Sequence, residues 1–253
     1  YSLGESAALF STRTWTERDL MYQRMQDSTL FTHDLAGACR SARSAWGLAD
    51  DQQVSWSLGV VMAPADNVRQ TIKEMQTGVD LPLASPFPLP LPYRVYLLII
   101  NTPDECVIGG DSAAVTELIK QLDCHFFPLY GVTTVHCAAA RPVAQPYHDL
   151  HLFTTNPPQS VTFYSNAKGD RFEPTRESCA AAILDQAVHG IDYPATIEAA
   201  YRDGVRLFLE MGPGNSCSRM ISRILEGRPH LARSACYSSQ DQEIGRASCS
   251  ERV

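Results

Sequence analysis

The sequence predicts an α/β protein in which a small inserted domain interrupts a larger body. Strand-like and helix-like segments alternate along most of the chain. Within residues 51–130 their order is strand, helix, strand, strand, helix, strand, as in the ferredoxin-like split βαβ unit. From residue 131 the simple alternation resumes. We therefore expect the body to comprise residues 1–50 and 131–242, with a ferredoxin-like βαββαβ insertion over 51–130.

The expected elements follow from apolar periodicity and from cap and turn residues. Segment 2–43 carries apolar residues at helical spacing, and Asp111 or Ser112 can cap a helix over 111–122. Five prolines between residues 82 and 92 predict an extended, exposed loop. The expected strands are 54–62, 93–100, 105–109, 124–129, 160–165 and 205–211, and the other expected helices are 65–75, 176–188, 194–203 and 216–225.

Composition limits the class of protein. The chain has 253 residues, 44% hydrophobic and 19% charged, so it can bury a core and does not have the composition of a disordered chain. A formal net charge of -7 argues against nucleic acid as the main partner. No apolar run reaches the roughly 20 residues of a membrane span. Eight cysteines without a Cys-x-x-Cys pair indicate reduced thiols in the cytoplasm, not a zinc site or a disulfide framework.

Both ends of the sequence are unusual. Tyr1 begins the chain inside a motif with no strand before it, so we expect an N-terminally truncated fragment. Residues 243–253 lack apolar periodicity and resemble a translated sequencing adapter. We therefore leave them out of the expected fold.

Ser2 is the first candidate catalytic residue. The run from Ser2 to Glu5 (Ser-Leu-Gly-Glu) stands before a helix-forming segment, as in the second half of a nucleophile elbow. In that device a strand turns sharply into a helix and exposes the serine hydroxyl. Gly4 lets the turn close, and the helix N-terminus favours developing negative charge. Read alone, Ser2 can also be an ordinary helix N-cap.

Five motifs in order make the signal more specific. They are Ser2-Leu-Gly-Glu5, Cys106-Val-Ile-Gly-Gly110, Thr133-Thr-Val-His-Cys137, Tyr164-Ser-Asn-Ala-Lys-Gly169 and Phe208-Leu-Glu-Met-Gly-Pro-Gly214. Together they resemble the malonyl-CoA:acyl-carrier-protein transacylase family, which includes the acyltransferase domains of fatty-acid and polyketide synthases. The run from Tyr1 to Ser6, with Asp192-Tyr-Pro194 and Met211 to Ser218, is most similar to the acyltransferase of bacterial polyunsaturated-fatty-acid synthases.

The resemblance implies a hydrolase-like parallel-sheet body, the ferredoxin-like insertion and a ping-pong acyl transfer. Ser2 would attack the thioester of a malonyl-CoA or another acyl-CoA. The phosphopantetheine thiol of an acyl carrier protein would then collect the acyl group. The implied partners are acyl-CoA, the carrier protein and other domains of a synthase, and no cofactor is expected to be bound.

The resemblance also implies roles for individual residues. His136 would be the general base and acid, oriented by a backbone carbonyl near Asp192, and the Leu3 N–H would supply one oxyanion donor. Arg24 is the arginine nearest to the position at which malonyl-selective members grip a carboxylate. Counting without gaps places Asp27 there, so the sequence leaves malonyl and a neutral acyl group equally open.

Other interpretations remain beside this one. A serine hydrolase or a thioesterase can carry the same nucleophile elbow. A non-catalytic synthase domain is a third interpretation, because it would explain why an acid, Asp27, stands at the position that grips a carboxylate. His136 can be a hydrogen-bonded core histidine, and Arg24 a solvated helix residue. His148 and His151 lie three residues apart, but with no third ligand we expect a polar helix face and no metal site.

Overall fold

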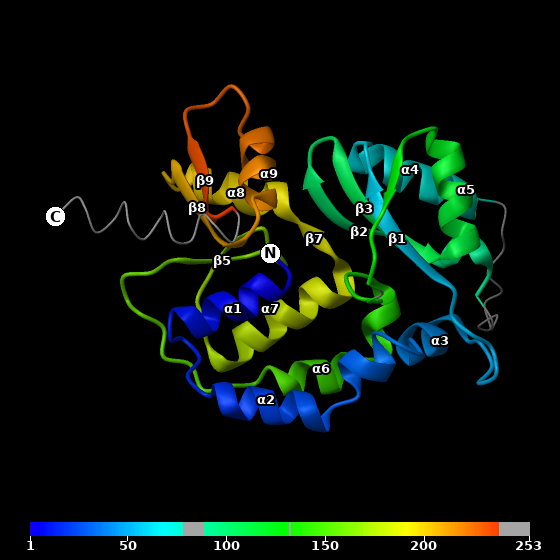
Figure 1. Ribbon diagram of the computed structural model, residues 1–253, viewed down its shortest axis with the longest axis horizontal. Coiled ribbons are helices and arrows are strands. Elements are labelled where there is room, and N and C mark those ends of the chain that lie inside the picture. The colour runs from blue at the N-terminus through cyan, green and yellow to red at the C-terminus, as the bar shows by residue number, and fades with distance from the viewer. Residues whose placement is uncertain (78–88, 132, 238–253) are drawn as a thin grey trace.

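The computed structural model describes residues 1–77, 89–131 and 133–237. They form a mixed α/β fold, as predicted. Figure 1 shows the segment predicted as an insertion, called the insertion below, on one side and a layer of helices below and to the other side. The strand pair β8 (Leu207–Pro213) and β9 (Leu231–Cys236), with helices α8 (Tyr193–Arg202) and α9 (Ser216–Ile224), lies above that layer. The N-terminus lies where these three parts meet (Figure 1).

The insertion has the predicted order of elements. Its strands pair antiparallel in the order β4-β1-β3-β2. The side chain of Asp111 accepts the Ala113 N–H, so the predicted cap of α5 is confirmed. The elements are β1 (Trp56–Val61), α4 (Ala65–Gln76), β2 (Val95–Thr102), β3 (Glu105–Asp111), α5 (Ser112–Leu122) and β4 (Phe126–Pro128).

One face of this sheet packs against helices α4 and α5, and the other faces the body. Val61 on β1 is fully buried in the core formed with α4 and α5. Because strand side chains alternate between faces, Val60 points to the opposite side. Val60 is paired in register with Val107 of β3 and packs against the core shared with the body.

The helical layer corrects the prediction for segment 2–43. The segment forms several helices because its backbone leaves the right-handed helical region at Arg13 after α1 (φ 59°), at extended Ser28 after α2, and at Cys39 immediately before α3 (φ 49°). These helices pack around a second core that contains Leu9, Trp15 and Phe153. The layer comprises α1 (Leu3–Ser11), α2 (Arg18–Asp27), a π-helical turn (Leu30–Asp34), α3 (Arg40–Trp46), a 3-10 segment (Ala138–Val143), α6 (Ala144–Leu150) and α7 (Arg176–His189).

Parallel pairing is present in two places. Strands β8 and β9 form a parallel pair, and β7 adds parallel to β2 at the edge of the insertion's sheet. Strands β5 and β6 form a separate antiparallel hairpin. Among the described residues the body therefore holds a smaller parallel sheet than the sequence predicts. The elements are β5 (Phe163–Ser165), β6 (Asp170–Phe172), β7 (Ile191–Asp192), α8 (Tyr193–Arg202), β8 (Leu207–Pro213), α9 (Ser216–Ile224) and β9 (Leu231–Cys236).

Several predictions fall at or beyond the described ranges. Most of the proline-rich loop and residues 243–253 lie outside the described residues. Pro90 and Pro92 flank the start of a 3-10 turn over Leu91–Tyr93, so this end of the loop is not simply extended.

No helix in the described part of the chain is long and apolar enough to cross a bilayer. The seven cysteines that the structure describes are free thiols.

Candidate active site

Ser2 lies at a strained point of the backbone, immediately before α1. Its φ is 51° and its ψ is -126°. A non-glycine residue held in such a conformation costs on the order of 1–3 kcal/mol, and such strain clusters at active sites. The Ser2 side chain caps no helical N–H; its Oγ lies 3.0 Å from Nε2 of His136. The plain N-cap interpretation of Ser2 is therefore wrong.

His136 is held by the last turn of α7. Its backbone N–H donates to the Ala187 carbonyl over 2.7 Å, and its Nδ1–H donates to the Gln186 carbonyl over 2.9 Å. Because a carbonyl can only accept, Nδ1 carries the proton and Nε2 presents its lone pair to the Ser2 hydroxyl. His136 is buried, and burial lowers the pKa of its imidazole below the ordinary value.

The carbonyl that orients His136 differs from the one expected. The Asp192 carboxylate accepts the Ala195 N–H, and the Asp192 carbonyl accepts the Thr196 hydroxyl. Asp192 is thus the N-cap of α8, and the prediction that its backbone orients His136 is wrong. The physical reason is that His136 lies against the last turn of α7, where the Gln186 carbonyl accepts the imidazole N–H in addition to the Gly190 N–H, and the Ala187 carbonyl accepts the His136 backbone N–H.

Arg24 also has a different role from the one expected. Its guanidinium donates to the carbonyls of Asp149, Leu150 and Leu152 at 3.3, 3.1 and 3.1 Å. It lies over the Phe153 ring, 4.5 Å from the centroid. Arg24 therefore joins α2 to the end of α6 and the residues just after it, and its guanidinium is used there. The alternative of a freely solvated Arg24 is excluded by the same contacts.

Leu3 occupies the first helical position of α1. The N–H at this position has no intrahelical acceptor, so it is available to a ligand. Leu3 is exposed. This arrangement suits one donor of an oxyanion site.

Two polar side chains, Glu5 and Tyr1, support the turn at Ser2, and neither was identified from the sequence as a functional group. The Glu5 carboxylate accepts the Asn166 N–H, which joins α1 to the β5–β6 turn. Burial raises the pKa of Glu5. On the other side of Ser2, the Tyr1 hydroxyl donates to Asn101 Oδ1 over 2.7 Å and so links the body to the insertion. Glu5 and Asn166 each lie in one of the five ordered motifs, and membership of these motifs is the sequence signal that could have identified them.

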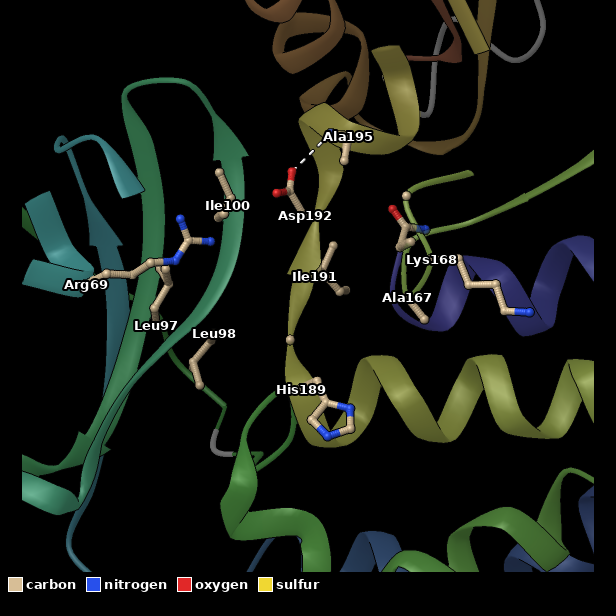
Figure 2. Close-up of a pocket in the computed structure, with 13 residues that line it drawn as sticks. Arg69, Leu97, Leu98, Ile100, Ala167, Lys168, His189, Ile191, Asp192 and Ala195 are labelled. Atoms are coloured by element: carbon tan, nitrogen blue, oxygen red, sulfur yellow. Dashed lines mark hydrogen bonds between the residues drawn. The ribbon is translucent and has the colours of Figure 1, made fainter. Parts of the chain in front are cut away.

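A cavity of about 410 Å³ lies where β2 meets β7, and residues of both strands and of the β5–β6 turn line it. Figure 2 shows Asp192 between Ile100 of β2 and the loop that carries Lys168. Gly190 forms part of the wall with φ 98°, and a Cβ there would lie 2.7 Å from the Leu98 carbonyl oxygen and 3.3 Å from that of His136. The close approach of insertion and body at this point thus requires glycine.

The two other histidines considered from the sequence do not converge on a metal. His151 is buried and its Nδ1–H donates to the Tyr147 carbonyl. His148 faces the carboxylates of Asp149 and Glu177. Within residues 1–77, 89–131 and 133–237 no group of three or more His, Cys, Asp or Glu side chains could hold a metal ion.

Comparison with curated sequences gives two distant relatives. The chain is 23% identical over 239 residues to a polyunsaturated fatty acid synthase polypeptide of a Thraustochytrium species, covering 88% of this chain and 11% of that protein. It is 24% identical over 207 residues to a PKS-NRPS hybrid synthetase of Aspergillus candidus, covering 77% of this chain and 7% of that protein. The chain thus spans about a tenth or less of each relative. No protein-family model matches it.

Solved structures share the fold. A malonyl-CoA:acyl carrier protein transacylase of Xanthomonas oryzae matches with a TM-score of 0.70 at 19% identity, over 98% of this chain and 70% of that one. The Clostridium perfringens enzyme of the same name matches with 0.66 at 18%, over 99% and 70%. A malonyl-transacylase in complex with its type II polyketide-synthase acyl-carrier protein matches with 0.69 at 19%, over 98% and 71%.

The fold is therefore that of the acyltransferases. More narrowly, the chain resembles the malonyl-CoA:acyl-carrier-protein transacylases and the acyltransferase domains of fatty-acid and polyketide synthases, as the five motifs predict.

Proposed function

We propose that this chain is an acyl-CoA:acyl-carrier-protein S-acyltransferase of fatty-acid or polyketide biosynthesis, acting through an acyl-serine. The observation that carries the proposal is the 3.0 Å contact between Ser2 Oγ and His136 Nε2. A strained nucleophile, an imidazole with its lone pair facing it and a carbonyl that fixes the tautomer are the parts of an activated serine. The same contact argues against a non-catalytic domain.

The proposed reaction has two halves. In the first, His136 Nε2 takes the proton from Ser2 as Oγ attacks the thioester carbonyl of acyl-CoA. The Leu3 N–H stabilises the oxyanion, and collapse expels the CoA thiol, which leaves with the proton from His136. In the second, the phosphopantetheine thiol of the carrier protein gives its proton to His136 and attacks the acyl-serine. Collapse returns the proton to Ser2 and releases the acyl-carrier thioester.

The architecture fits this role. We assign residues 1–50 and 131–242 to a hydrolase-like body and residues 51–130 to a ferredoxin-like insertion. The βαββαβ order and the β4-β1-β3-β2 pairing support the second assignment. The partners would be acyl-CoA, the carrier protein and neighbouring synthase domains. The free thiols fit a cytoplasmic site of action.

Partition of the acyl group tests the proposal. The chain is incubated with radiolabelled acyl-CoA and phosphopantetheinylated carrier protein, and label on the carrier protein is compared with free acid. A transferase delivers most of the label to the carrier protein, and His136→Ala lowers the rate by about 10²–10⁴. Label that appears as free acid at the same rate with and without carrier protein identifies a hydrolase instead.

A further inference from the structure

A cavity of about 550 Å³ lies where helix α9 meets strand β9. It is lined at α9 by Asn215, Ser218, Arg219 and Ser222, and at β9 by residues 232–234. None of its lining residues in the described part of the chain belongs to the insertion or to the pair of catalytic candidates. The cavity is therefore separate from the candidate active site, and its own side chains indicate what it can bind.

The cavity is basic. Arg219 and Arg233 line it, and no aspartate or glutamate is among its described lining residues. Within the described ranges neither guanidinium makes an ion pair, and that of Arg233 donates to the Ala232 carbonyl. The nearby Arg223 and Arg228 are each paired with a carboxylate. Two positive charges thus line one cavity without a described anion to balance them.

A buried hydroxyl at this cavity has no partner either. Ser218 is 7% exposed, and its Oγ makes no hydrogen bond within residues 1–77, 89–131 and 133–237. A buried hydroxyl without a partner costs free energy that a hydrogen-bonding ligand would recover. Ser222 follows one helical turn later and brings a second hydroxyl to the same cavity. The lining therefore suits a ligand that accepts several hydrogen bonds.

The N-terminus of α9 is not the source of these donors. The Glu210 carboxylate accepts the N–H groups of Cys217 and Ser218 over 3.2 and 2.7 Å, so these first-turn groups are already used. Glu210 itself does not line the cavity. A ligand there would be held by side chains, with the two guanidiniums and the Ser218 hydroxyl as its contacts.

We propose that this cavity binds a phosphate group, with Arg219 and Arg233 as cationic contacts and the Ser218 hydroxyl as a further donor. A guanidinium can donate two parallel hydrogen bonds to phosphate oxygens, and a phosphomonoester carries about -1.5 to -2 charges at neutral pH. Two unpaired guanidiniums match that charge, whereas a carboxylate balances one of them and a neutral ligand balances none. The proposal does not rest on acylation of Ser2.

Calorimetric titration of the chain with inorganic phosphate tests the site. We expect saturable binding that is weakened about tenfold or more in Arg233→Gln and in Ser218→Ala, since a hydrogen bond to a charged group contributes roughly that factor. Arg176→Gln is the matched control, because Arg176 is exposed, pairs with Glu177 and does not line the cavity. Acetate should bind at least about tenfold more weakly than phosphate. Phosphate binding that is absent, or equal in the wild type and Arg233→Gln, would overturn the proposal.

Thermal unfolding shows whether the variants fold and whether the Ser218 hydroxyl is free. Without phosphate, Ser218→Ala should unfold at or above the wild-type midpoint, because the hydroxyl it removes has no partner. Excess phosphate should raise the midpoint of the wild type more than that of Arg233→Gln. A midpoint of Ser218→Ala below the wild type in phosphate-free buffer would mean that the hydroxyl is bonded within the protein, against the proposal.

Three further ligands identify the source of the phosphate group. CoA and dephospho-CoA differ by one phosphomonoester, and phosphopantetheine carries a phosphomonoester without the nucleotide. CoA that binds about tenfold tighter than dephospho-CoA, with the difference lost in Arg233→Gln, would assign the site to the nucleotide phosphate of CoA. Phosphopantetheine that binds tighter than inorganic phosphate would assign it to the pantetheine phosphate. Binding of inorganic phosphate without either preference would assign it to the free anion.

Discussion

The Nδ1–H of His136 donates to the main-chain carbonyl of Gln186 across 2.9 Å. A carbonyl in this place does the orienting work that a carboxylate does in a Ser-His-Asp triad, but it brings no negative charge. The imidazole is therefore not stabilised as a cation by an ion pair, and burial lowers its pKa. This relationship determines how the proposed reaction responds to pH.

Acylation of Ser2 is expected to persist into mildly acidic solution. His136 must be neutral to accept the proton, and its pKa lies below the ordinary value of about 6.5. The rate should therefore be level at neutral pH and fall only as pH drops through the lowered pKa. Initial acylation rates between about pH 8 and pH 5 measure this, with circular dichroism at each pH to show that the chain is folded. A midpoint above about 7 would contradict the burial of a neutral imidazole.

Ser2→Gly is expected to be more stable than Ser2→Ala by about 1 kcal/mol. Both variants lose the hydroxyl, but only glycine adopts a φ of 51° and a ψ of -126° without strain. Urea unfolding gives the difference in the free energy of unfolding. Ala7→Gly is the control, because exposed Ala7 lies inside α1, where glycine should be less stable than alanine. Equal stability of the two Ser2 variants would mean that the turn stores no strain.

Gly190→Ala is expected to cost more stability than Gly204→Ala. The two glycines have φ values of 98° and 99°, so alanine is disfavoured by the backbone at both positions. A Cβ at Gly190 would lie 2.7 Å from the Leu98 carbonyl oxygen, whereas one at Gly204 meets no atom within 4 Å. The difference in thermal midpoint isolates the clash between β2 and the body. Gly190→Ala should also slow acylation, because the Leu98 and His136 backbones must move apart.

Arg24→Ala is expected to lower the free energy of unfolding by about 1.5–3 kcal/mol. It removes a charged donor from three carbonyls and a cation from the face of Phe153. Arg176→Ala is the comparison, since Arg176 makes an exposed pair with Glu177 and should change stability by less than about 1 kcal/mol. Urea titration of both variants gives the values. If Arg24→Ala lowers the free energy of unfolding no more than Arg176→Ala does, the contacts of Arg24 do not stabilise the fold.

The order of elements within residues 51–130 is predictable because the strands and helices are separated by cap and turn residues, such as Asp111. The sequence also predicts that Ser2 and His136 lie close together, since both stand in recognisable motifs. It does not predict Gln186 as the partner of His136, because a main-chain carbonyl has no side-chain signature and its availability depends on where α7 ends. The breaks at Arg13 and Cys39 are missed for a similar reason: neither residue type is typical of positive φ.

Mapping the residue that carries the acyl group tests the central claim most directly. The chain is treated with an acyl-CoA, digested and analysed by tandem mass spectrometry, alongside Ser2→Ala. The account predicts an ester on Ser2 that is absent from the variant and strongly reduced in His136→Ala. An adduct on another side chain, such as Cys217 in α9, with Ser2 unmodified, would contradict it.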